Sequence, residues 1–219
     1  NIDAFPSFVY SFTAEMFYML RMILPLIVIY ITYTLKVTKK EFLQLFLIVT
    51  FISSLIIVGT NLLGVALTSY GGNNKISGNI FSWFMSDKPG PRELASKGWF
   101  NSANQISGLF AMLLPIVIYA ALDKFNWKRA TILILTIIAM LMLGTRVSSI
   151  GWVLILVVML MIYLFFNIIL KQFKFQKKNF FGTLIIGCLC GLLLMFSPLV
   201  NTNSGVDEDA LDAYLKDKE

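Results

Sequence analysis

The residues most able to do chemistry in this chain are cations beside or inside long apolar segments. Arg146 follows the turn residues Gly144 and Thr145, and the apolar run before it, 130–143, spans about 21 Å as a helix. Because a membrane presents about 30 Å of hydrocarbon, we expect Arg146 to lie below the outer surface, at the floor of an outward-facing recess. There a guanidinium can bind a diphosphate through paired hydrogen bonds. The alternative is an interfacial arginine that caps a helical hairpin and meets lipid head groups.

Three further cations are candidates for binding an anionic substrate. Arg21 lies inside an apolar segment and can reach outward along its helix, so anion binding and pairing with another helix both remain open. Arg92 and Lys97 belong to a polar loop that also carries aromatic residues. That loop either guides an anionic lipid-linked substrate into the recess or lies on the bilayer as an interfacial segment.

Asn104 opens a stripe of small and polar residues with helical spacing. The stripe continues through Ser107, Gly108, Ala111 and Pro115. In a membrane such a stripe is typical of close helix packing, and the alternative is a wall of a hydrated cavity. Gly187 and Gly191 form a GxxxG pair, for which helix packing is expected, within the chain or between chains.

Other catalytic chemistries have little support in the sequence. Histidine is absent, and no glycine-rich phosphate loop occurs. Asp207 and Asp209 have a metal-binding spacing but sit in an acidic, solvated tail, so we expect no metal site and no cofactor. Cys188 and Cys190 point to nearly opposite sides of a helix and are expected to be small buried residues.

The composition defines the class of protein that must position these residues. Of 219 residues 58% are hydrophobic and 14% are charged, against about 25% charged in soluble domains. The net charge of +6 comes from short basic clusters between apolar runs, which is typical of membrane topology and not of nucleic-acid binding. Soluble, disordered and disulfide-stabilised classes are excluded.

The apolar segments predict an all-α, multi-pass transmembrane helical bundle of about six spans. A single membrane domain is expected over 1–200, with a polar outside loop at 68–102 and the start of a further outside loop at 201–219. Because the chain has no initiator Met and no completed final loop, we expect it to be a fragment. The predicted spans are about 12–35, 42–67, 103–122, 130–143, 147–170 and 180–200.

The basic clusters predict one orientation for all these spans. They alternate with the long loop, the Gly144 turn and the acidic tail, so positive charge gathers on a single face. That face is expected to be cytoplasmic, which places both ends of the chain outside. The clusters are Lys36, Lys39 and Lys40; Lys124, Lys128 and Arg129; and Lys171, Lys174, Lys177 and Lys178.

The third to fifth segments resemble a known family of membrane enzymes. Gly98, Phe100, Asn101 and Asn104 precede a helix rich in small residues, and Arg146 follows a small-residue turn one helix later. This pattern resembles the bacterial O-antigen ligase and O-antigen polymerase superfamily, that is, lipid-linked polysaccharide ligase-like membrane proteins.

The resemblance implies a GT-C-like fold and a glycosyltransferase of cell-surface polysaccharide assembly. It would ligate or polymerise glycans from an undecaprenyl diphosphate carrier onto a glycan or glycolipid acceptor, on the outer face of the bacterial cytoplasmic (inner) membrane and without a nucleotide sugar. Arg146 matches the family's turn arginine. Lys97 is nearest to its second basic residue, with Arg92 as the only loop arginine.

The sequence departs from the family pattern at two positions. Ala103 stands where a proline is frequent, and the histidine thought to activate the acceptor hydroxyl is absent. We expect that histidine to lie beyond Glu219, so that this fragment alone is inactive. The alternatives are a transporter or flippase of polyprenyl-linked glycans and a non-catalytic membrane scaffold.

Overall fold

The computed structural model describes residues 12–36, 38–64, 79–84, 95–100, 102–169, 176–197 and 200. The side chain of Arg21 lies outside this description, as do Arg92, Asn101 and the acidic residues 207–209. By its contacts the chain divides into two units, Asn1–Phe42 and Leu43–Glu219, and each is described by itself.

Every regular element in the described ranges is a helix, which confirms the expected all-α membrane bundle. Within the described residues, four helices are long and apolar enough to cross a membrane, against about six predicted spans. They are α2 (Lys39–Leu63), α4 (Ala103–Asp123), α6 with its extension (Arg146–Asn167) and α7 (Lys177–Leu194).

The first unit contains α1 and the beginning of α2. α1 runs from Phe12 to Thr34, and Lys36 then takes a left-handed conformation with φ 49°. A capping box starts α2: Thr38 N donates to Glu41 Oε2 (2.9 Å), and Glu41 N donates to Thr38 Oγ1 (3.3 Å). The chain therefore ends one helix and begins the next within a few residues.

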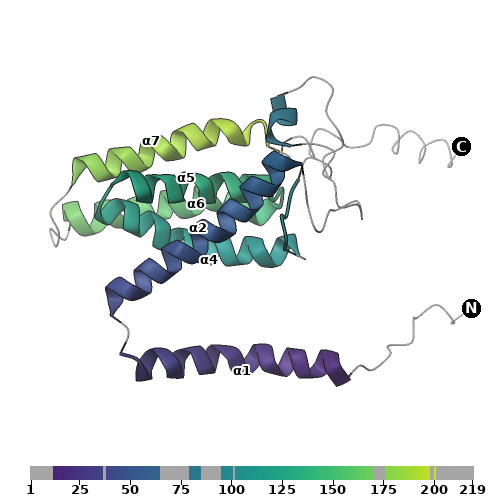
Figure 1. Cartoon of the computed structure of the whole chain (residues 1–219). Helices are drawn as coiled ribbons and strands as arrows, with labels where there is room; N and C mark the ends of the chain where they lie inside the picture. The colour runs from purple at the N-terminus through teal and green to yellow at the C-terminus, as the bar shows by residue number, and fades with distance from the viewer. Residues whose placement is uncertain are drawn as a thin grey trace, which may run out of the picture. The chain divides into compact units, whose positions relative to one another are not determined.

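The second unit is a bundle of α4, α5, α6 and α7 (Figure 1). α5 runs from Trp127 to Met142. α6 (Arg146–Leu164) continues into the π-helix η2 (Phe165–Ile169). A short 3₁₀ helix, η1 (Ile80–Phe84), lies near the end of α2, because Ile80 N donates to Asn61 Oδ1 at 2.9 Å.

α5 is the central helix of this bundle. None of residues 130–143 is exposed, and Leu133, Ile137 and Met140 are completely buried. α5 packs against α4, α6 and α7, and Ser54 Oγ of α2 donates to Thr136 Oγ1 at 3.4 Å. The short length of α5 is therefore compatible with a membrane location, because protein and not lipid surrounds it.

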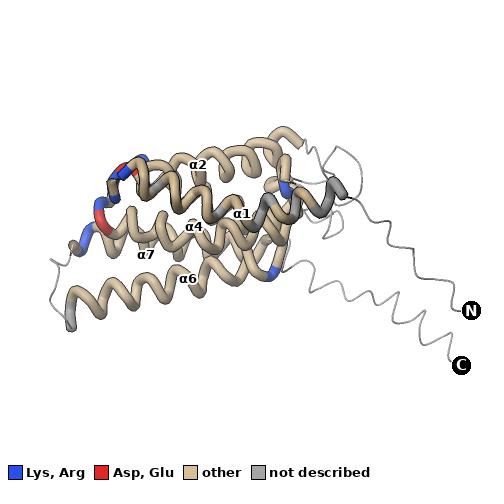
Figure 2. The backbone as a smooth tube through the Cα atoms, turned by 90° about the horizontal axis from the view of Figure 1, so that it is seen from below, with Lys and Arg blue, Asp and Glu red and all other residues tan. Residues whose placement is uncertain are grey.

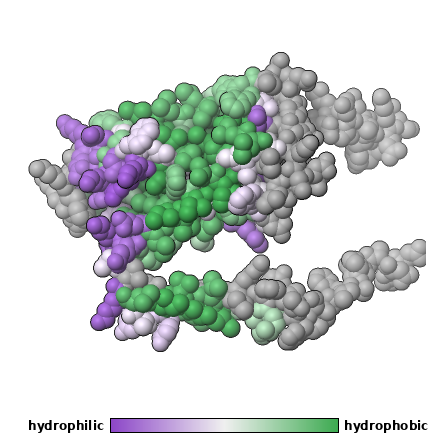
Figure 3. All heavy atoms as spheres, in the orientation of Figure 1, coloured by the Kyte–Doolittle hydropathy of each residue, from purple (hydrophilic) through white to green (hydrophobic). Residues whose placement is uncertain are grey.

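Charged and apolar residues of the second unit lie at different levels along the helix axes. Basic residues gather at the turn between α4 and α5 and at the start of α7, an end that we call the basic end (Figure 2). Apolar side chains cover the middle of the bundle (Figure 3), with exposed examples such as Leu154, Val157 and Leu189. This is the surface expected of a helical bundle in lipid.

Candidate functional site

The end opposite the basic end carries the start of α4, the turn before α6 and the loop 95–100; we call it the loop end. The loop is fixed to the central helix, because Ser96 N donates to Met142 O at 2.8 Å. Gly98 has φ +58°, and a Cβ added there would lie 3.3 Å from Ile57 Cα and 3.3 Å from Thr60 Oγ1. Glycine is thus required both by the left-handed backbone and by the close approach to α2.

A chain of hydroxyl groups joins α4 to α6 at this end. Ser107 Oγ and Thr145 Oγ1 are 2.7 Å apart, and Thr145 Oγ1 is 2.8 Å from Ser148 Oγ. Thr145 also caps α6, since its Oγ1 accepts from Ser148 N at 3.2 Å. Ser107 and Ser148 are completely buried, so the network fixes the position at which α6 begins.

Arg146 is the first residue of α6, and its side chain is exposed. Its neighbour Thr145 is level with Ser107, which lies about 6 Å along α4 from Ala103. The backbone of the arginine is therefore about one helical turn deeper in the bundle than the start of α4.

The two helices that begin at this end supply positive dipole ends. α4 and α6 lie side by side and both start here, so their unpaired N–H groups point to the same side. Ser102, the N-cap of α4, makes no side-chain capping bond. Two helix starts and one guanidinium together favour the binding of an anion.

The structure brings three of the predicted site residues to the loop end. Arg146 begins α6, Asn104 is exposed in the first turn of α4, and Lys97 is partly exposed in the loop next to Ser96. Arg92 and Asn101 are outside the described residues, and so is the side chain of Arg21. Among the described residues no group of three or more potential metal-binding His, Cys, Asp or Glu side chains occurs.

The small-residue stripe of α4 does not form one packing face. Ser107 is buried, but a Cβ added at Gly108 would meet nothing within 4 Å. Helix packing on α4 uses the bulky face that includes Phe110 and Leu114. By contrast, a Cβ added at Gly187 would overlap the side chain of Leu156, so this member of the GxxxG pair packs within the chain.

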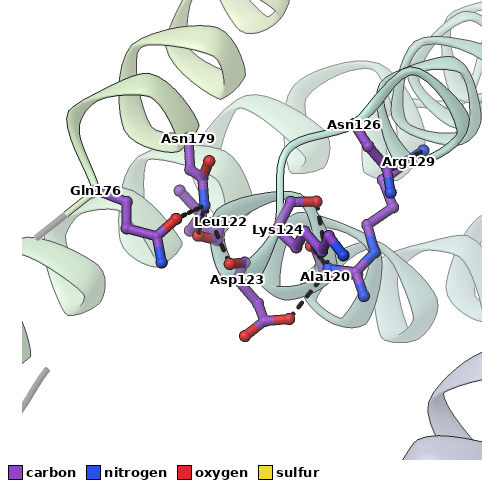
Figure 4. A network of polar contacts seen from close by, with 8 residues as sticks. All are labelled: Ala120, Leu122, Asp123, Lys124, Asn126, Arg129, Gln176 and Asn179. Atoms are coloured by element: carbon purple, nitrogen blue, oxygen red, sulfur yellow. Dashed lines mark hydrogen bonds and ion pairs between the residues drawn. The ribbon is translucent and has the colours of Figure 1, made fainter. Parts of the chain in front are cut away.

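The predicted site did not include a polar network at the basic end (Figure 4). Asn179 Nδ2 lies 2.9 Å from Leu122 O, 3.0 Å from Asp123 O and 2.6 Å from Gln176 Oε1. Arg129 contacts Asp123 Oδ2 at 3.0 Å. These contacts tie α7 and α5 to the end of α4. No local spacing predicts them, because Asn179 and Leu122 are 57 positions apart.

The fold and this distribution of residues define an integral membrane protein built as a helical bundle, with the loop end opposite the basic end. The sequence model of the family described as "O-antigen ligase like membrane protein" matches residues 4–213, and the chain belongs to this family. At the general level this family membership indicates a glycosyl-transfer enzyme of polysaccharide assembly that acts on lipid-linked glycans. Comparisons with curated proteins and with solved structures gave no match.

Proposed function

We propose that the protein transfers a glycan from undecaprenyl diphosphate to a glycan or glycolipid acceptor, on the outer face of the bacterial cytoplasmic membrane. The observation that carries this proposal is the position of Arg146 at the start of α6, beside the uncapped start of α4. Family membership supports the glycosyl-transfer class, and the loop-end geometry supports a diphosphate as the group that is bound.

In the proposed reaction the acceptor hydroxyl oxygen attacks the anomeric carbon of the lipid-linked sugar. The bond between that carbon and the diphosphate oxygen breaks, and undecaprenyl diphosphate leaves with the bonding electron pair. The hydroxyl proton passes to a base, for which the family resemblance implies a histidine beyond Glu219. Negative charge therefore grows on the diphosphate during the reaction. A guanidinium and two helix starts held in place by buried hydroxyls stabilise that charge without reorganising.

The proposed orientation places the basic end in the cytoplasm and the loop end outside. This orientation is supported by the cations of the basic end, because short loops rich in Lys and Arg are retained on the cytoplasmic side. These cations are Lys124, Lys128, Arg129, Lys177 and Lys178. In this orientation the two ends of the chain are outside. Arg146, Asn104 and Lys97 would then face the compartment in which lipid-linked glycans are consumed, with Arg92, Asn101 and Arg21 as further candidates.

The test is consumption of an undecaprenyl diphosphate-linked glycan in proteoliposomes, using protein expressed from its whole gene. The comparison is native protein against Arg146→Ala and Arg146→Lys, with Lys128→Ala as the control because Lys128 is an exposed cation at the basic end. We expect both Arg146 variants to lose about 100-fold or more in rate, as for loss of an oxyanion donor, and the control to keep its rate. A charge-only anchor would tolerate lysine.

Two results would contradict the proposal. One is native activity of the Arg146→Lys variant, because this result would show that binding of the diphosphate does not require paired hydrogen bonds. The other is movement of the lipid-linked glycan across the bilayer without cleavage, which would replace the transferase with a transporter.

A further inference from the structure

The basic end contains a cavity that the proposed transfer reaction does not use. It has a volume of about 290 Å³ and lies between the end of α4, the end of α6, η2 and the start of α7. This volume is close to the lower limit of about 300 Å³ for small-molecule sites. A cavity of this size suits a head group and not a whole lipid.

One of the residues that line the cavity carries a buried acceptor atom without a partner. Asn167 lines the cavity and is 7% exposed, and its Oδ1 makes no hydrogen bond. The amide orientation is fixed, because Nδ2 donates to Tyr163 O at 2.6 Å. A buried acceptor left unpaired is costly, so a ligand whose N–H or O–H donor draws this oxygen toward the cavity is favoured here.

Asn167 owes its position to a local change of helix type. It lies in η2, where α6 changes from α-helix to π-helix for the residues Phe165–Ile169. Such wide turns occur mostly as single turns within α-helices and are frequent at functional sites. The change of helix type therefore coincides with the unpaired acceptor.

The remaining walls combine aromatic rings with a carboxylate. Tyr119, Tyr163 and Phe166 line the cavity, and so does Asp123, whose carboxylate also contacts Arg129. Aromatic faces and a carboxylate both attract cations. Together with the unpaired oxygen of Asn167, they favour a cationic group that carries N–H donors, such as the primary ammonium of a phospholipid head group.

The rim of the cavity has the opposite charge. Lys124 follows Asp123 and Lys177 follows Gln176 in the sequence, and both lysines are exposed. We propose that the cavity binds the ammonium of a phosphatidylethanolamine-type phospholipid from the leaflet at the basic end, with the lipid phosphate near these lysines. The acyl chains then lie along the exposed apolar surface of α6, for example at Ile162.

The test is native mass spectrometry of the full chain, purified in detergent and mixed with one phospholipid at a time. The probes are phosphatidylethanolamine, phosphatidylcholine and phosphatidylglycerol with identical acyl chains. Phosphatidylcholine carries a cation without N–H donors, and phosphatidylglycerol carries no cation. We expect retention of phosphatidylethanolamine about tenfold above both, the effect of one hydrogen bond to a charged group.

Two variants locate the site. Asn167→Leu removes the acceptor and Ile162→Phe narrows the cavity, and both are expected to lower phosphatidylethanolamine retention to the level of phosphatidylcholine. Gln105→Leu makes a similar amide-to-leucine change at an exposed position of the loop end and is the control for lipid retention. If Asn167→Leu does not fold, Ile162→Phe decides the question by itself, because it touches no hydrogen bond of the site.

The proposal is overturned if phosphatidylcholine or phosphatidylglycerol is retained as well as phosphatidylethanolamine. It is also overturned if Ile162→Phe retains phosphatidylethanolamine like the native chain. Neither outcome bears on Arg146, so the lipid site and the transfer reaction stand or fall separately.

Discussion

Ser107 Oγ of α4 lies 2.7 Å from Thr145 Oγ1, the N-cap of α6. This contact joins two helices across 38 positions of sequence and sets Arg146 beside the first turns of α4. Neutral hydroxyls, together with the packing of α6 against α4, therefore help to fix the depth from which the guanidinium extends.

Replacing Thr145 by valine should weaken both the protein and its proposed site. Thr145→Val removes the cap on Ser148 N and one of the two hydrogen bonds of the buried Ser107 hydroxyl, which keeps its bond to Ala103 O at 2.6 Å, and each loss costs about 1 to 2 kcal/mol. We expect a lower Tm in detergent. We also expect a fall in glycan transfer at temperatures where the variant is still folded.

The control for Thr145→Val is Thr34→Val, at an exposed threonine whose hydroxyl bonds only within its own helix. It should change stability by less than about 0.5 kcal/mol. Equal Tm values for the two variants would show that the contact between Ser107 and Thr145 does not hold α6 in place.

The two glycines Gly187 and Gly151 should respond in opposite ways to alanine. A Cβ at Gly187 overlaps Leu156, so Gly187→Ala should destabilise the bundle by about 1 to 3 kcal/mol. A Cβ at Gly151 meets nothing within 4 Å, so Gly151→Ala should be neutral or stabilising by up to about 1 kcal/mol. Thermal unfolding in one detergent measures both, and a stable Gly187→Ala would contradict the close packing of α6 and α7.

Asn179 should be the most sensitive polar residue of the basic end. Asn179→Leu removes an amide that faces Leu122 O, Asp123 O and Gln176 Oε1. Leaving these acceptors without that donor should cost about 1 to 3 kcal/mol. The neighbouring exposed Lys178→Ala is the control and should stay within about 0.5 kcal/mol. Similar unfolding temperatures for the two variants would show that this network is dispensable.

The proposed orientation predicts which ends react with a membrane-impermeant thiol reagent. In a background with Cys188 and Cys190 replaced by serine, Asn104→Cys should be labelled on intact cells. Lys128→Cys should be labelled only after the membrane is opened. The reverse pattern would place the basic end outside and remove the loop end from the compartment of the lipid-linked substrate.

Apolar length and local turn chemistry were enough to predict the long helices of the described residues, but not the short helices η1 and η2. The long helices occupy the apolar segments read from the sequence, and the turn at Gly144 has the left-handed backbone that glycine permits, with φ 63°. The structure changes one detail, namely which face of α4 packs against its neighbours. That face includes Phe110 and Leu114 and is not the whole small-residue stripe. Small residues indicate where helices are able to approach but not which neighbour does so.

The candidate site was only partly predictable for a physical reason. Arg146 stands out in the sequence because a charge between apolar runs is unusual. Asn167 and Asn179 do not stand out, because an asparagine near a helix end is common and its partners lie in other segments. Their roles depend on contacts between side chains that only the folded bundle brings together.

The short central helix has a consequence for biosynthesis. α5 has 16 residues, with Lys128 and Arg129 in its first turn, whereas a helix needs about 20 apolar residues to span the hydrocarbon by itself. α5 is therefore not expected to enter the membrane alone when it leaves the ribosome. It should insert as a hairpin with α6, and the newly made chain then places Arg146 at its final depth before α7 has been synthesised.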